Sequence, residues 1–167
     1  VALINERIGN VKDFCELGPG NGTLIKDLSK NLNKLIKEEL NFFLFEKSNS
    51  LKESIKKNVR EKNISLLKKL ILPPRPIIFI ANEFFDALPI NQFEKTSEGW
   101  LERRIHLVEG KLKLILKKNP FFKIGENYGR KGDIDEVSPY TNLYLKRIFS
   151  HLKEFGGGLL IFDYGPQ

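Results

Sequence analysis

The sequence contains little cysteine or histidine and no long hydrophobic run. Its single cysteine, Cys15, excludes an internal disulfide framework. Because Cys15 lies inside an apolar segment, we interpret it as a small buried residue rather than a nucleophile. The two histidines, His106 and His151, are far apart and have no cysteine or carboxylate neighbours at ligand spacing, so no metal site is expected. No apolar run approaches the roughly 18 residues of a membrane-spanning helix, and no signal peptide is visible.

The composition is that of a globular domain. Of the 167 residues, 41% are hydrophobic and 29% are charged, a balance that differs from that of disordered segments. The length suffices for one hydrophobic core, so residues 1–167 are expected to form a single domain. The sequence starts at Val1 rather than Met and ends just after an apolar run, so we expect it to be a fragment of a longer protein.

The positive charge of the chain is spread rather than clustered. A formal net charge of +7 is compatible with binding to the phosphate groups of a nucleic acid. The lysines are distributed along the predicted helices and loops, however, and no basic patch is visible in the sequence. We therefore interpret the lysines as solvated surface residues and do not expect a nucleic acid as the partner.

Apolar runs that resemble buried strands alternate with helical patterns along most of the chain. The four clearest runs occupy residues 11–17, 41–46, 77–81 and 159–164. Apolar residues at helical spacing predict helices over 23–39, from Ser50 in an S-x-x-E capping box, and over 139–155. Such an alternation predicts an α/β fold with a doubly wound, mostly parallel sheet. The carboxyl ends of its strands should form the binding edge.

Three segments depart from this alternation. From about residue 90 to 118 the apolar period changes to two, with turn signals between the runs, which predicts an inserted antiparallel β-meander. Residues 63–72 fit either a short strand or a helix. Residues 119–135 contain three glycines and few apolar residues, so a loop is expected there.

A glycine turn joins the first predicted strand to the first full helix. It reads Glu-Leu-Gly-Pro-Gly-Asn-Gly-Thr over residues 16–23. Its glycines permit positive φ and the close approach of a ligand to bare backbone, and the following helix start offers unpaired N–H groups. The spacing of the glycines differs from the G-x-G-x-x-G of dinucleotide sites, and a pyrophosphate would be repelled by Glu16.

Two carboxylates near this turn suit S-adenosylmethionine, which has no phosphate and carries an ammonium and a sulfonium group. Glu16 stands two residues before the first glycine, where it can face a cation. Glu46 ends the second predicted strand, where a carboxylate can accept hydrogen bonds from both ribose hydroxyls. The alternative for Glu46 is that it only caps the strand or pairs with a lysine.

The segment Asn82-Glu83-Phe84-Phe85-Asp86 follows the strand over 77–81. Enzymes that methylate exocyclic base nitrogens commonly place Asn or Asp, then Pro, then an aromatic residue at this point. This segment has no proline and carries two further carboxylates, so it favours a cation. A guanidinium would be held and oriented by bidentate, charge-assisted hydrogen bonds.

The alternative is that the acidic residues of this segment cap a following helix, with Phe84, Phe85 and Leu88 in the core. For Asp86 both interpretations remain open. For Glu83 we favour a functional role.

Five blocks of the sequence resemble the MidA family of methyltransferases. They are ELGPGNGTL at 16–24, FEKS at 45–48, NEFFDALPINQFEKTSEGWLER at 82–103, EVSP at 136–139 and GGGLLIFDYG at 156–165. Mitochondrial members of this family are assembly factors for respiratory complex I that dimethylate a protein arginine symmetrically. The resemblance implies a class I, Rossmann-like methyltransferase fold that uses S-adenosylmethionine and needs no metal.

The resemblance also implies roles for individual residues. The cofactor would be bound by Glu16, Gly18, Gly20 and Glu46. Asn21 and Gly22, in the same glycine turn, are further candidates for cofactor binding. The acceptor pocket would be bordered by Asn82, Glu83 and Asp86, with Asp163 and Tyr164 on the same edge.

The activity implied is transfer of a methyl group to an arginine nitrogen of a protein, with a subunit of respiratory complex I as the candidate partner. The expected location is the mitochondrial matrix in a eukaryote and the cytoplasm in a bacterium. Two alternatives stay open: an assembly factor that binds the cofactor without catalysis, and an RNA methyltransferase. The missing proline after Asn82 disfavours the second.

Overall fold

The structure is a computed structural model that describes residues 6–9, 11–36, 39–59, 63–121 and 128–164. Its contacts divide the chain into two compact units. The first consists of Val1–Ala87 and Tyr144–Gln167, and the second of Leu88–Leu143. None of the helices among the described residues has the length and hydrophobicity that a membrane-spanning helix needs.

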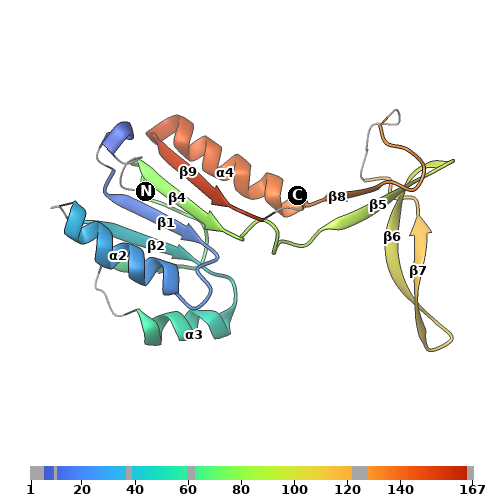
Figure 1. The fold of residues 1–167 in the computed structure, drawn as a ribbon, viewed down its shortest axis with the longest axis horizontal. Helices are drawn as coiled ribbons and strands as arrows, with labels where there is room; N and C mark the ends of the chain where they lie inside the picture. The colour runs from blue at the N-terminus through green and yellow to red at the C-terminus, as the bar shows by residue number, and fades with distance from the viewer. Residues whose placement is uncertain (1–5, 10, 37–38, 60–62, 122–127, 165–167) are drawn as a thin grey trace. The chain divides into compact units, whose positions relative to one another are not determined.

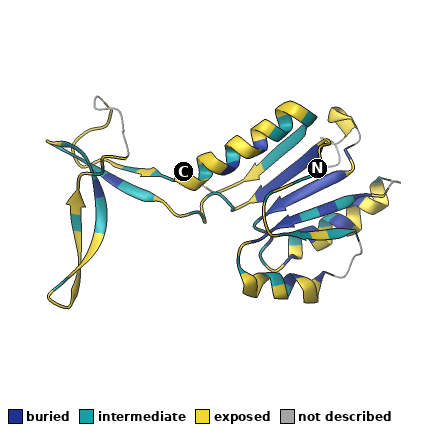
Figure 2. Cartoon of the chain, turned by 180° about the vertical axis from the view of Figure 1, so that it is seen from behind, coloured by how far each residue is buried: buried dark blue, intermediate teal, exposed yellow. Residues whose placement is uncertain are grey.

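Five parallel strands form the sheet of the first unit (Figure 1). In sheet order they are β3 (Ile64–Leu67), β2 (Asn41–Phe45), β1 (Asp13–Leu17), β4 (Ile77–Asn82) and β9 (Gly157–Phe162). The central strands β1 and β4 are almost completely buried, because helices cover both faces of a parallel sheet (Figure 2). The predicted α/β class and parallel sheet are therefore confirmed, and the ambiguous residues 63–72 contain a strand.

Helices cover the two faces of this sheet. On one face, α2 (Thr23–Leu35) and α3 (Asn49–Asn58) contribute Ile25 and Ile55 to the same core cluster as Phe14 of β1. On the other face, α4 (Pro139–Phe155) buries Tyr144 and Ile148, and the Tyr144 ring lies 5.6 Å from that of Phe45. Strand side chains alternate between the faces, so each strand supplies both cores.

Two predicted helix boundaries were wrong. Helix α2 ends at Leu35 rather than at residue 39, because Ile36 already has an extended backbone with φ −103°. Helix α3 begins at Asn49, so Ser50 lies inside the helix and does not cap it. The cap is Ser48, whose Oγ accepts a hydrogen bond from Leu51 N–H.

The second unit is an antiparallel sheet in the order β7-β6-β5-β8. Its strands are β5 (Asn91–Thr96), β6 (Gly99–Val108), β7 (Lys111–Lys117) and β8 (Ile134–Val137). The predicted meander corresponds to the first three. The fourth was missed, because residues 119–135 were expected to form a loop. Its charged sequence shows no strand pattern, and β8 forms by pairing with β5 from Asn91↔Val137 to Glu94↔Ile134.

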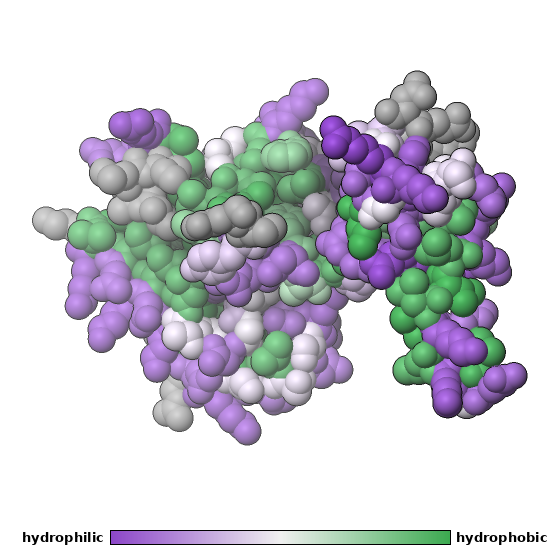
Figure 3. All heavy atoms as spheres, turned by 45° about the vertical axis from the view of Figure 1, so that its right-hand side comes forward, coloured by the Kyte–Doolittle hydropathy of each residue, from purple (hydrophilic) through white to green (hydrophobic). Residues whose placement is uncertain are grey.

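The hairpin of β6 and β7 has one apolar face that is open to solvent. Pairing places Ile105 opposite Leu114 and Leu107 opposite Leu112, with 47–75% of each residue exposed. Figure 3 shows apolar side chains gathered along this hairpin. Its turn consists of Glu109 and Gly110, which both have positive φ, as a two-residue hairpin turn requires.

Candidate cofactor and acceptor site

The parallel register brings the predicted site residues to the same edge of the sheet. Leu17 is level with Phe45 and Ala81, and Asn82 is level with Phe162. The residues at or just beyond these strand ends therefore lie along the carboxyl edge. They include Glu16, the glycine turn, Glu46, Asn82, Glu83 and Asp163. This is the edge at which open α/β sheets bind ligands.

The glycine turn adopts backbone angles that favour glycine. Gly18, Gly20 and Gly22 have φ of 66°, 57° and 83°. The N–H of Gly18 donates to Phe45 O at 2.9 Å, which ties the turn to the end of β2. A Cβ atom at Gly20 would meet no atom of the described residues within 4 Å, so this part of the turn presents open backbone. Such a turn leaves room for a ligand close to the main chain.

Asn21 has a local structural contact within the same turn. Its Oδ1 accepts hydrogen bonds from Thr23 N–H at 3.2 Å and from Thr23 Oγ1 at 2.6 Å. The side chain thus satisfies a donor of the first turn of α2, as short polar side chains commonly do at helix starts. The backbone O of Asn21 accepts a further hydrogen bond from Asn58 Nδ2 of α3 at 3.1 Å, so Asn21 connects the turn to α3 as well.

Glu16 is a buried carboxylate with an unsatisfied oxygen. The residue is 2% exposed, and among the described residues its Oε2 has no hydrogen-bond partner. Burial raises the pKa of Glu16 from 4.5 to about 7. A buried polar atom without a partner is costly, so it points to a donor supplied by a ligand.

Glu46 is oriented by the chain that follows it. Only 8% of the residue is exposed, and its Oε1 accepts a hydrogen bond from Ser48 N–H at 2.8 Å. This bond connects the end of β2 to the residue that caps α3. The carboxylate is thereby held at the carboxyl edge of the sheet. It lies beside the glycine turn, because β2 and β1 are neighbouring strands.

Residues 82–86, which the sequence predicts to border the acceptor pocket and which we call the acceptor segment, leave β4 in an unusual conformation. Asn82, Glu83 and Asp86 are all exposed. Glu83 has φ 48°, a left-handed value that costs a residue with a side chain about 1–3 kcal/mol. Its N–H donates to Phe162 O at 2.8 Å, so β9 holds this conformation on one side. Strained backbone of this kind is often found at functional sites.

No helix follows the acceptor segment. Residues 84–90 form turns and irregular structure, and the next element is β5, which begins at Asn91. The alternative that Glu83 and Asp86 cap a helix is therefore wrong. The aromatic pair Phe84 and Phe85 is only partly buried.

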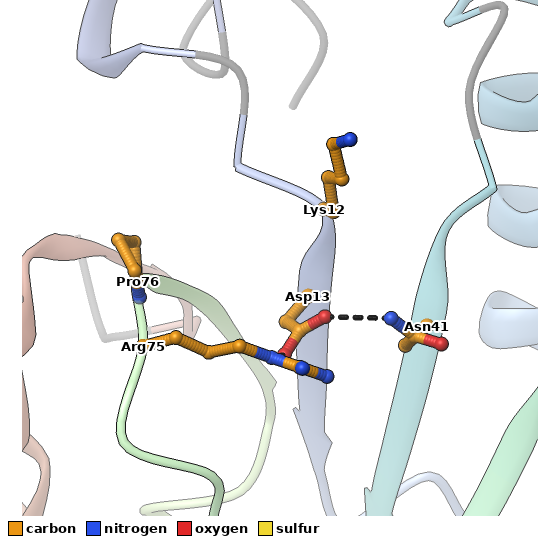
Figure 4. Close-up of a pocket in the computed structure, with 5 residues that line it drawn as sticks. All are labelled: Lys12, Asp13, Asn41, Arg75 and Pro76. Carbon is orange, nitrogen blue, oxygen red and sulfur yellow. Dashed lines mark hydrogen bonds and ion pairs between the residues drawn. The ribbon is translucent and has the colours of Figure 1, made fainter.

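A cavity of about 250 Å³ opens at the opposite, amino edge of the sheet (Figure 4). It is lined by Lys12, Asp13, Asn41, Arg75 and Pro76. Asp13 is 2% exposed, forms an ion pair with Arg75 and accepts a hydrogen bond from Asn41 Nδ2 at 2.8 Å. The sequence did not suggest this cluster. Because both carboxylate oxygens have partners, it fits a structural ion pair.

Comparisons with known proteins agree with this architecture. A family model described as S-adenosyl-L-methionine-dependent methyltransferase matches residues 4–167. The chain is 30% identical to the mitochondrial protein arginine methyltransferase NDUFAF7 homolog of Caenorhabditis elegans, over 90% of this chain and 42% of that protein. It is 30% identical to mitochondrial protein arginine methyltransferase NDUFAF7 of Xenopus tropicalis, with the same coverage. The chain thus spans less than half the length of these relatives.

A solved structure shares the fold. A protein from Burkholderia thailandensis in complex with S-adenosyl-homocysteine superposes with a TM-score of 0.78 at 20% identity. The superposition covers 99% of this chain and 45% of that protein.

Proposed function

Because the chain belongs to the MidA family of S-adenosyl-L-methionine-dependent methyltransferases, we propose that it methylates an arginine nitrogen of a protein. The unsatisfied Oε2 of the buried Glu16 is the observation that carries the cofactor side of this proposal. The names of the relatives support arginine as the acceptor. A subunit of respiratory complex I as the acceptor protein rests on the resemblance of the sequence blocks.

The cofactor would be held by Glu16 of β1, by the glycine turn and by Glu46, which directly follows β2. The ammonium group of S-adenosylmethionine fits the unsatisfied Glu16 oxygen, because a cationic donor offsets the cost of a buried carboxylate. Glu46 would accept from the ribose hydroxyls, and the open backbone at Gly20 would lie along the ligand. When bound, the cofactor supplies a methyl group that is activated by the sulfonium.

The acceptor arginine would be held by Glu83 and Asp86. Both carboxylates are exposed in a short turn after β4 and can accept hydrogen bonds from the planar guanidinium. Holding the guanidinium fixes the direction of one nitrogen, which is the main contribution that positioning makes to a displacement reaction. The same carboxylates can take the proton that the nitrogen releases on methylation.

The hairpin of β6 and β7 would contact the acceptor protein. Its open face carries Ile105, Leu107, Leu112 and Leu114, and exposed apolar patches of this kind mark interaction sites.

The experiment that tests the proposal uses full-length protein, isotopically labelled S-adenosylmethionine and a candidate respiratory complex I subunit. We expect mass spectrometry to find a labelled methyl group on an arginine of the subunit. The matched variant is Glu83→Gln, which keeps the shape of the side chain and removes its charge. It should lose at least roughly 100-fold in methyl transfer, as expected for a carboxylate that positions the acceptor.

Binding of S-adenosyl-homocysteine, measured by calorimetry, is the control for the same samples. Glu83→Gln should bind it as the unchanged protein does, whereas Glu16→Gln should bind it more weakly. If binding is intact but no arginine is methylated, the catalytic proposal fails and the non-catalytic assembly factor stands.

A further inference from the structure

The ring of Phe84 occupies the space beside Gly18 in the glycine turn. A Cβ atom added at Gly18 would lie 2.8 Å from Phe84 Cδ2, closer than real side-chain carbons approach. Gly18 also has φ 66°, which a residue with a side chain rarely adopts. Glycine is thus required here for two separate reasons, its backbone conformation and the neighbouring ring. Phe84 of the acceptor segment and Gly18 of the glycine turn are therefore in direct contact.

Phe84 belongs to an aromatic cluster in the first unit. Its ring centroid lies 5.3 Å from that of Phe85, 5.3 Å from that of Tyr144 and 6.5 Å from that of Phe45. These separations are within the range of favourable edge-to-face aromatic pairs. The cluster connects the acceptor segment to the end of β2 and to α4, so the ring cannot move without disturbing several neighbours.

The residue before Phe84 is Glu83, the proposed acceptor carboxylate with a left-handed backbone. Such a conformation persists only where the surrounding structure holds it. On one side the hydrogen bond from Glu83 N–H to Phe162 O fixes the chain to β9. On the other side the packed ring of Phe84 fixes the next residue against Gly18. The direction of the Glu83 side chain therefore depends on where the glycine turn places Phe84.

We propose that Phe84 is a positioning residue that couples the glycine turn to Glu83. A ligand that orders the turn around Gly18 also orders the Phe84 ring, and through it the backbone that carries the carboxylate. The inference rests on the proposed function only for the role of Glu83. The coupling itself is measured by ligand binding and hydrogen exchange. The coupling can therefore be disproved while arginine methylation is confirmed, and it can be confirmed while arginine methylation is disproved.

The first test is a double-mutant cycle read by S-adenosyl-homocysteine affinity in calorimetry. Gly18→Ala pushes a methyl group into the Phe84 ring and should weaken binding at least roughly 30-fold. Adding Phe84→Ala removes the ring and makes space for that methyl group. The double variant should therefore bind at least roughly 5-fold more tightly than Gly18→Ala alone, a non-additive result. Equal or weaker binding of the double variant would overturn the proposal.

The matched control for this cycle is Gly20→Ala. Gly20 has φ 57°, so alanine meets a similar conformational cost there, but its Cβ atom would meet no described residue within 4 Å. The effects of Gly20→Ala and Phe84→Ala on affinity should be additive in the double variant. If Phe84→Ala restored binding to Gly20→Ala as well, the contact between Gly18 and Phe84 would not be specific. If Phe84→Ala does not fold, Phe84→Leu repeats both cycles, because it removes the ring and keeps an apolar side chain.

The second test follows the amide of Glu83 by hydrogen exchange. Saturating S-adenosyl-homocysteine should slow exchange of this amide at least roughly 5-fold in the unchanged protein, because the ordered turn stabilises its bond to Phe162 O. In Phe84→Leu, equally saturated, the slowing should disappear. Phe149→Leu, on the exposed side of α4, should behave like the unchanged protein. Slowing that persists in Phe84→Leu, or is absent from the unchanged protein, would disprove the coupling.

Discussion

Two carboxylates on strand β1 lie three residues apart and have opposite environments. Asp13 and Glu16 are both 2% exposed. Asp13, at the amino edge of the sheet, has partners for both of its oxygens in Arg75 and Asn41. Glu16, at the carboxyl edge, has one oxygen without a hydrogen-bond partner among the residues that the structure describes, and its pKa is raised by burial. The same kind of group thus has both oxygens paired at one edge of the sheet and one oxygen unpaired, among the described residues, at the other.

Another buried carboxylate, in the second unit, resembles Asp13 in having hydrogen-bond partners. Glu102 is 5% exposed and accepts hydrogen bonds from Asn91, Arg104 and Asn119. Burial alone therefore does not identify a binding residue, because Asp13 and Glu102 are also almost completely buried. The missing partner distinguishes Glu16, and the predictions below test that distinction.

The largest effect is expected on stability from Glu16→Gln. The folded protein holds a proton on Glu16 between pH 4.5 and about 7, where the unfolded chain releases it. This stabilising contribution is fully present below pH 4.5 and is lost as the pH rises to about 7. At pH 8 the variant should therefore be more stable by up to about 3 kcal/mol, and near pH 4.5 it should be little changed.

Urea unfolding of both proteins at pH 4.5 and at pH 8 measures this difference. A variant that is equally stable or less stable at pH 8 would show that Glu16 is satisfied in the folded protein, as Asp13 is.

The next largest effect is expected from Arg75→Met. Removing Arg75 leaves the carboxylate of Asp13 buried with Asn41 as its remaining partner, which should destabilise the protein by about 2 kcal/mol, less than for a fully buried pair. Urea unfolding at pH 7 measures the loss. Arg147→Met, at an exposed position on α4, should change stability by less than about 0.5 kcal/mol. The affinity for S-adenosyl-homocysteine should not change in either variant, and a large loss in Arg75→Met would assign a binding role to the amino edge.

A smaller effect is expected in the pH dependence of cofactor binding. Ionised Glu16 binds an ammonium group better than neutral Glu16, so S-adenosyl-homocysteine affinity should rise about tenfold from pH 6 to pH 8 and level off above the Glu16 pKa of about 7. Calorimetry at several pH values measures the curve. Glu16→Gln should remove most of this rise. The same rise in the variant would assign it to another group.

The smallest effect concerns the helix cap beside Glu46. Ser48→Ala removes the hydroxyl that accepts from Leu51 N–H and should cost about 1 kcal/mol of stability, as N-cap losses typically do. Its backbone N–H still reaches Glu46 Oε1, so cofactor affinity should stay within about twofold. Ser50→Ala, at the position that the sequence pattern favoured, should cost less than Ser48→Ala in thermal unfolding. A larger loss of stability in Ser50→Ala than in Ser48→Ala would instead identify Ser50 as the cap.

The architecture was largely predictable from local patterns. Runs such as residues 77–81 are apolar at every position, which is typical of a strand covered on both faces, and alternation with helical segments then predicts a parallel sheet. The glycine turn was also visible, because positive φ at three positions within five residues favours glycine strongly. The strand β8 and the cap at Ser48 were missed, since both depend on partners that the local pattern does not show.

The sequence by itself determined which residues gather at the carboxyl edge, because each ends or follows a strand and the strands are parallel. Only the tertiary structure decided which buried acids have partners. Asp13 meets Arg75 across 62 residues of chain, and Phe84 meets Gly18 across a similar separation. Hydrogen bonds and ring contacts depend on distances of a few ångströms, and those distances exist only once the strands are paired. The difference between Asp13 and Glu16 is therefore a property of the fold, although both are read from the same five-residue strand.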